Sequence, residues 1–207
     1  FRTASKIPIE RWAVALNSRL PEDIVVHSAR EVPEHFHAIR SALRKTYRYT
    51  INTSRFPDPF RRKYEYHHPI PLDVEAMRKG LAHLVGEHDF TSFASPQSQL
   101  DNHVRTIYEA RLELEEPPLS FPTLLEDFDR ERYPGRTRAL IHLYITGNGF
   151  LYQMVRIIAG TILLVGEGKL SPDDIPAILA AKDRNRAGPT AVPWGLTLWD
   201  VVYEIDF

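Results

Sequence analysis

The stretch TGNGFLYQMVRIIAGTILLVG, residues 146–166, is apolar almost throughout after Gly149 and yet carries Arg156 near its middle. From Phe150 to Val165 it is too long for a strand and apolar on nearly every side, which predicts a buried helix. A guanidinium stays protonated in a protein, so an arginine inside such a helix needs an acidic partner, usually a carboxylate or a phosphate. Nothing in the sequence pattern marks one acid of the chain as that partner.

The segments around this helix predict the elements of an α+β fold. Tyr47, Tyr49 and Ile51 alternate with polar residues, which is typical of a strand. The order of the elements is strand, helix, strand, strand, helix, extra helix and strand, as in the ferredoxin-like folds. We therefore expect an antiparallel or mixed sheet with helices packed on one face. Besides the helix of residues 150–165, the expected strands are 45–52, 104–115, 138–146 and 196–205, and the expected helices are 72–86 and 171–184.

The chain divides into two unequal parts. Residues 7–21 predict a short helix and residues 23–32 a strand, together the tail of an α/β unit whose beginning lies before Phe1. We expect residues 1–32 to be the remnant of an N-terminal half and residues 33–207 to form a complete C-terminal half. Within the latter, the Pro-rich, acidic stretch 116–137 is far longer than a hairpin turn and predicts a surface insertion.

Composition limits the classes of function. The 207 residues carry a net charge of −1 and no Cys, which excludes disulfides and thiolate chemistry and fits a reducing compartment such as the cytoplasm. The apolar run contains Gln153 and Arg156 and is shorter than a membrane span, so we expect no membrane segment. His35 and His37, like the pair His67 and His68, have no Cys or tight acid cluster to complete a metal site, and we expect no metal.

Basic residues gather in one stretch, residues 40–63, where a single acid, Asp58, opposes eight of them. Four aromatic residues are interleaved, among them Tyr47 and Phe60. Cations bind phosphate and aromatic faces stack on unpaired bases, so the pattern favours RNA binding. The alternative is a structural role, in which the cations form a solvated surface and the aromatic residues belong to the core. The candidates are Arg40, Arg44, Lys45, Arg48, Arg55, Arg61, Arg62 and Lys63, joined by Lys182, Arg184 and Arg186 from a later loop.

Seven segments in order resemble the bacterial tRNA pseudouridine synthase A family: ALNSRLPEDI, FHA, KTYRYTI, GEHDFTSF, VRTIYE, TGNGFLYQMVRIIAG and AAKDRNRAGPTAVPWGLTLWDV. The resemblance covers the chain apart from residues 116–137. It implies a pseudouridine synthase fold and an isomerase without a cofactor, which converts uridine to pseudouridine at positions 38, 39 and 40 of the tRNA anticodon arm. It also implies a homodimer whose partner is tRNA, with the target base flipped from its stack.

The resemblance carries two functional roles to positions of this chain. Tyr47 matches the family tyrosine that stacks on the target uracil and later takes its proton. Arg156 matches the arginine that pairs with the catalytic aspartate, which acts as nucleophile or as base. One departure is local, because the family has an arginine directly after Phe-His-Ala where this chain has Ile39.

The catalytic aspartate belongs to a Gly-Arg-Thr-Asp-x-Gly-Val-His motif that these 207 residues do not contain. The family spacing places it shortly before Phe1, so we expect the chain to be truncated and inactive alone. The alternative is a non-catalytic RNA-binding module of ferredoxin-like type, and a scaffold without RNA is a third possibility. A buried Arg156 favours the enzyme, since a binding module has no need of such a charge.

Overall fold

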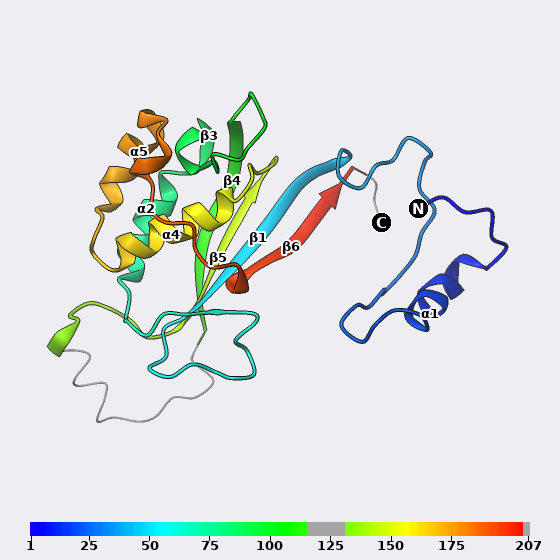
Figure 1. Ribbon diagram of the computed structural model, residues 1–207, viewed down its shortest axis with the longest axis horizontal. Helices are drawn as coiled ribbons and strands as arrows, with labels where there is room; N and C mark the ends of the chain where they lie inside the picture. The colour runs from blue at the N-terminus through cyan, green and yellow to red at the C-terminus, as the bar shows by residue number, and fades with distance from the viewer. Residues whose placement is uncertain (116–130, 205–207) are drawn as a thin grey trace. The chain divides into compact units, whose positions relative to one another are not determined.

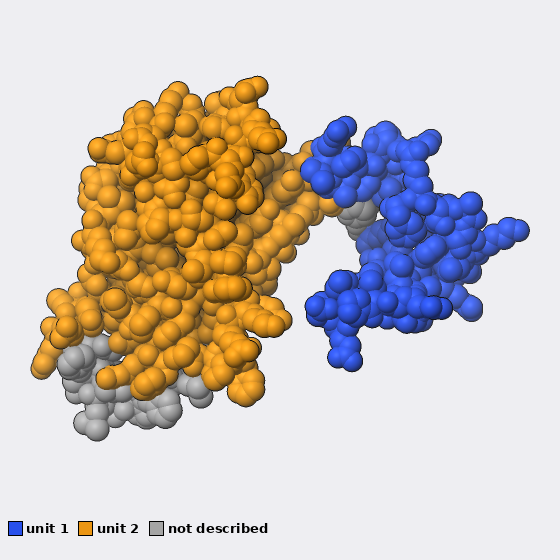
Figure 2. Space-filling view, in the orientation of Figure 1, with its two compact units in different colours: residues 1–41 blue, residues 42–207 orange. Residues whose placement is uncertain are grey.

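The computed structural model describes residues 1–115 and 131–204, which fall into two compact units (Figure 1 and Figure 2). The first unit is Phe1–Ser41 and the second is Ala42–Phe207. The second contains the sheet and the long helices. The division into halves that the sequence analysis expects after residue 32 stays a prediction.

The first unit contains one short helical segment. A 3-10 turn, η1 (Ile9–Arg11), leads into α1 (Trp12–Asn17), as the sequence predicts for residues 7–21. The strand predicted over residues 23–32 is absent, and that prediction is wrong. A strand persists only where its main-chain groups find a partner, and residues 1–41, all described, contain no other strand to supply one.

A six-stranded sheet is the centre of the second unit. Its four longer strands follow the order β6-β1-β5-β4 with antiparallel neighbours, which is the ferredoxin-like arrangement. Two short strands lie at the margins, β2 parallel to the end of β1 and β3 antiparallel to β4. The strands are β1 (Ala42–Asn52), β2 (Tyr66–His67), β3 (Gly86–Asp89), β4 (Val104–Glu115), β5 (Leu140–Gly147) and β6 (Leu196–Tyr203).

The helices of this unit gather on one side of the sheet (Figure 1). α2 (Val74–Ala82) begins at Asp73, whose side chain accepts a hydrogen bond from Ala76 N at 2.9 Å. α5 (Ile175–Ala181) follows a 3-10 turn, η3 (Pro172–Asp174), which starts with a capping box. These caps satisfy main-chain donors that a helix leaves free at its start. The expected α+β class, with helices on one face of a mixed sheet, is confirmed.

The third helix, α4 (Met154–Gly166), is the most deeply buried of the three. Eleven of its residues are buried, and only Arg156 and Leu164 are not. It begins at Met154, later than the predicted Phe150, because Gln153 takes a left-handed conformation with φ of 61° and so interrupts the helical backbone. The expected buried helix is confirmed, but Arg156 lies at its half-exposed edge.

Strand register places the side chains of β1. From Lys45 to Asn52, β1 pairs with β5 without a break. Because successive side chains alternate, Tyr47, Tyr49 and Ile51 share the face that the helices cover. On the other edge, the ladder with β6 is irregular: Thr46 pairs with Asp200 and Tyr47 with Leu198, so that Trp199 is an extra, bulged residue.

Part of the expected insertion can be located. Residues 116–130 lie outside the described residues. Its last residue, Thr137, pairs with Leu72 just before α2, with N–H to O distances of 3.2 and 2.9 Å. Arg136 Nη2 donates to Glu167 O at 2.6 Å. These hydrogen bonds therefore hold the segment that leads into β5 next to the start of α2.

Gly160 provides a test of the packing between α4 and the loop that follows α5. A Cβ at Gly160 would overlap the carbonyl oxygen of Pro189, and main-chain atoms cannot move aside cheaply. We expect Gly160→Ala to lower the free energy of unfolding by roughly 2 kcal/mol or more, although Ala favours a helix over Gly by about 1 kcal/mol. Urea unfolding measures this. Gly149→Ala, which meets only the Arg105 side chain at 3.6 Å, is the control, and equal stabilities of the two variants would contradict the packing.

Candidate functional site

Arg156 lies in the first turn of α4 and is tied to the main chain of one loop residue. Its Nε donates to Ala191 O at 2.6 Å, and its own carbonyl accepts from Ala191 N at 3.0 Å. Within the described part of the chain, no carboxylate lies within ion-pairing distance of the guanidinium. The expectation of a fully buried charge is wrong, because the side chain leaves the helix at the edge of the core. The group is held in place and can still receive an acid.

Tyr49 fixes the next carbonyl of the same loop. This tyrosine is wholly buried on β1, and its hydroxyl donates to Val192 O at 2.8 Å. Burial raises the pKa of Tyr49 well above its usual value, with Tyr66 adding to the effect and Arg156 opposing it. The hydroxyl therefore stays protonated and remains a donor. Consecutive carbonyls are thus held by β1 and by α4.

The loop itself, residues 187–195, packs closely on both elements. Thr161 Oγ1 accepts from Gly188 N at 2.9 Å. A Cβ at Gly195 would lie 2.6 Å from Thr50 O, so only glycine allows this approach to β1. From the far side, Arg184 Nη2 donates to Thr190 Oγ1 at 3.2 Å. The result is a rigid support that sets the direction of Arg156.

Tyr47 lies two residues before Tyr49 on the same face of β1 and is half-buried. Its ring meets Phe150 edge-on, with 5.1 Å between the ring centroids. Phe150 precedes α4, so one ring contact joins β1 to the segment that leads into the helix carrying Arg156. The structure thereby places Tyr47 and Arg156, the two residues to which the resemblance assigns roles, on the helix side of the sheet.

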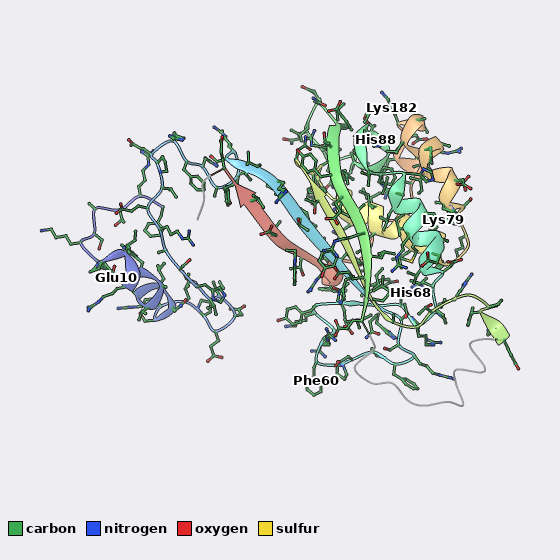
Figure 3. All side chains as sticks on the ribbon, turned by 180° about the vertical axis from the view of Figure 1, so that it is seen from behind. Glu10, Phe60, His68, Lys79, His88 and Lys182 are labelled. Atoms are coloured by element: carbon green, nitrogen blue, oxygen red, sulfur yellow. The ribbon has the colours of Figure 1, made fainter. Side chains whose placement is uncertain are left out.

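Several predicted RNA-binding cations are exposed. Arg62 and Lys63 lie in the segment between β1 and β2 and form no ion pair within the described residues. Phe60, in the same segment, is 91% exposed and projects from the surface (Figure 3). Exposed cations beside exposed rings suit a nucleic acid. Further exposed candidates are Arg55 and Arg44 in the second unit and Arg40 in the first, with the aromatic residues Phe56 and Tyr64.

Other candidates already have partners inside the protein. The Arg48 guanidinium lies 3.9 Å from the centroid of the Trp199 ring, on the face of the sheet away from the helices. Lys182 Nζ lies 2.8 Å from Asp89 Oδ2, and Arg61 Nε lies 3.5 Å from a Glu65 oxygen. Burial lowers the pKa of Arg184, which supports the loop. Lys45 is half-buried on β1. The charge cluster seen in the sequence is therefore only partly a free surface.

Residues 1–115 and 131–204 contain no group of three or more His, Cys, Asp or Glu side chains placed to hold a metal ion. In the same part of the chain, no helix has both the length and the apolarity to cross a membrane.

Sequence reasoning missed three residues near this site. In the sequence, nothing distinguishes Tyr49 from an ordinary core residue, and only Tyr47, two positions earlier on the same strand, was assigned a role. Glu65 and Trp194 carry no signal in the sequence, because only folding brings them to one cavity.

The contact between Asp89 and Lys182 makes the stability of the fold sensitive to pH. Lys182, then Thr91, holds the pKa of the Asp89 carboxyl down at about 2, against an ordinary value of 3.8. Since the folded pKa is the lower one, the carboxylate stabilises the fold above pH 3.8, and this contribution is lost as the pH falls towards 2. We expect Lys182→Gln to raise the Asp89 pKa towards 3.8, as measured by NMR titration of the carboxyl carbon.

Lys169→Gln removes an equally exposed lysine that pairs with Glu167 instead, and it serves as the control. An Asp89 pKa that stays at about 2 in Lys182→Gln would contradict the assigned cause.

Comparison with known proteins points to one family. Residues 81–204 match the family described as tRNA pseudouridine synthase. The tRNA pseudouridine synthase A of Bacillus velezensis is 46% identical over 204 residues, which cover 99% of this chain and 74% of the relative. The enzymes of that name from Bacillus subtilis and Caldicellulosiruptor bescii are each 45% identical, over 99% and 98% of this chain and 74% of each relative. The resemblance seen in the sequence is confirmed, and the chain belongs to the tRNA pseudouridine synthase family.

Proposed function

We propose that this chain is the arginine-bearing, RNA-binding part of a tRNA pseudouridine synthase that acts on uridines 38, 39 and 40 of the anticodon stem-loop. The family consists of isomerases, and the observation that carries the proposal is the fixed, half-exposed Arg156 on the same side of the sheet as Tyr47. In the reaction the bond from C1′ to N1 breaks, the uracil turns, and C1′ bonds to C5, which loses its proton while N1 gains one. The atoms balance without any co-reactant, so no cofactor is required.

Arg156 holds the catalytic carboxylate. Because Nε is bound to Ala191 O, the two Nη groups remain to bind a carboxylate. Their planar, two-pronged geometry matches the two carboxylate oxygens better than the compact ammonium group of a lysine would. The carboxylate comes from the Gly-Arg-Thr-Asp segment, which is not among these 207 residues. The isolated chain therefore binds RNA weakly at best and does not turn over.

Tyr47 supplies a face for the flipped uracil. Its edge contact with Phe150 fixes the ring, and a fixed ring stacks on a base at little entropic cost. Its hydroxyl is then placed to take the C5 proton after the base has turned.

The exposed cations and rings between β1 and β2 hold the tRNA. Arg62 and Lys63 neutralise phosphates, while Phe60 offers an open face to an unpaired base.

The enzyme works as a homodimer in the cytoplasm, where its tRNA substrate is found, and has no membrane partner.

One observation favours the second candidate, a non-catalytic RNA-binding module. Arg156 is not fully buried and already has a main-chain partner in Ala191, so a purely structural role would also explain it. The two candidates differ in what the loss of the guanidinium does to turnover when the loop remains folded.

Tritium release from [5-³H]uridine-labelled tRNA tests the function directly. We expect no release by the isolated 207-residue chain, which nevertheless retains tRNA in a salt-dependent manner. The natural gene product that includes the chain and the residues encoded before Phe1 should release tritium. Release by the isolated chain would contradict the assignment of the acid to an upstream segment. No release by the gene product would contradict the function itself.

Replacing Arg156 separates catalysis from binding. In the gene product, we expect Arg156→Ala to lower kcat by about 10²- to 10³-fold, because a catalytic carboxylate loses its opposing charge. The affinity for tRNA should change little. Arg78→Ala, which removes an exposed arginine paired with Glu75, is the control. Wild-type turnover in Arg156→Ala would favour the binding module.

The Tyr47 hydroxyl can be tested apart from its ring. Tyr47→Phe keeps the stacking face, so we expect KM for tRNA to stay within about twofold, while kcat falls by about tenfold or more if the hydroxyl accepts the proton. Single-turnover kinetics with the gene product measure both. Tyr108→Phe, at an exposed position of β4, is the control. An unchanged rate would restrict Tyr47 to stacking.

A further inference from the structure

A cavity of about 250 Å³ lies between the segment that joins β1 to β2 and the loop that holds Arg156. Glu65, Asp58 and Arg62 line it from the first segment, and His67 lines it from β2. Trp194 lines it from the loop, and it is 56% exposed. Its lining thus combines the exposed indole ring of Trp194 with the buried carboxylate of Glu65.

Glu65 is the unusual member of this cavity. The residue is only 3% exposed, yet just one of its oxygens is satisfied, by Asn52 Nδ2 at 2.6 Å from Oε1. Oε2 accepts no hydrogen bond from any described residue. Arg61 Nε lies 3.5 Å away, which is an ion-pair contact but too long for a good hydrogen bond. A buried acceptor without a donor is costly, so this oxygen is suited to a ligand that brings an N–H group.

The surroundings select the kind of ligand. The described residues provide no cluster placed for a metal ion, so the missing partner is a hydrogen-bond donor rather than a cation of that kind. Trp194 offers an exposed face on which a planar base can stack. Arg62 and the neighbouring Lys63 are exposed and can neutralise the phosphate of a bound nucleotide.

The cavity also adjoins the loop to which Arg156 is hydrogen-bonded. Val192, which lines it, accepts the Tyr49 hydroxyl, and the preceding carbonyl, that of Ala191, accepts from Arg156. A base bound here would lie close to the loop that directs the arginine.

We propose that this cavity is a second base-binding site, which takes a non-target base with an exocyclic amino group, guanine best of all. The inference rests on the proposed function only in that the ligand is RNA.

The carboxylate discriminates between bases. Uracil has one donor on its pairing edge, N3–H, flanked by two carbonyl oxygens that would face the Glu65 carboxylate and be repelled. Guanine presents N1–H and the N2 amino group side by side, and a carboxylate can accept from both. Adenine and cytosine offer only an amino group beside an acceptor. The expected order is guanine, then adenine and cytosine, then uracil, so the site is distinct from that of the target uridine.

Nucleoside monophosphates test this directly. In the gene product, the indole N–H signal of Trp194, assigned with Trp194→Phe, should respond to GMP at lower concentration than to AMP or CMP, and least to UMP. IMP keeps N1–H and lacks the N2 amino group, so we expect it to bind about tenfold more weakly than GMP. Equal binding of GMP, IMP and UMP, or no binding of any of them, would overturn the proposal.

Two variants assign the contacts. Glu65→Gln can still accept from Asn52 through Oε1, but it should lose the preference for GMP over UMP, with GMP binding about tenfold weaker. Trp194→Ala should weaken all nucleotides about tenfold and preserve their order. Glu87→Gln, at an exposed position of β3, should change nothing. If Glu65→Gln fails to fold, the comparison of GMP with IMP on the wild type decides.

The tritium assay keeps this inference separate from the proposed function. Release of tritium without any base preference would overturn only the second site. A clear preference for GMP without tritium release would overturn only the synthase activity.

Discussion

Two hydrogen bonds between Arg156 and Ala191 are the constraint on which the candidate site depends. One runs from side chain to main chain and the other from main chain to main chain, so a single loop residue is held at both its N–H and its C=O. The approach is possible because glycine stands at position 160 of α4, where any Cβ would meet Pro189. Packing between a helix and a loop, rather than burial of a charge, explains why the arginine has a defined direction.

The longer elements could be predicted from the sequence, because each of them repeats its pattern several times. The alternation around Tyr47 predicted β1, and α2 and α5 lie within the helices expected over residues 72–86 and 171–184. The marginal strands β2 and β3, of two and four residues, are too short to show any period. Their existence depends on longer neighbours, which is a tertiary effect.

The candidate site was predictable only in part, for similar reasons. Family motifs pointed to Tyr47 and Arg156, and the structure places both on the helix side of the sheet. The exposure of Arg156 depends on where α4 begins, and a left-handed Gln153 sets that start. Glu65 lies just after the basic stretch of residues 40–63, and nothing in the sequence singled it out. Its unsatisfied oxygen becomes visible only when Asn52, Arg61 and the cavity are seen together.

The bulge at Trp199 has a consequence for how the chain can change over evolution. β1 keeps one unbroken register with β5, and β5 leads directly to α4, so Tyr47 and Arg156 are positioned along that route. The ladder between β1 and β6 already contains an extra residue and a second irregularity near Ala42. The last strand can therefore gain or lose a residue there without displacing the pair. A change in length is therefore tolerated in β6, which pairs with one edge of β1, but not in β5, which pairs with the other edge.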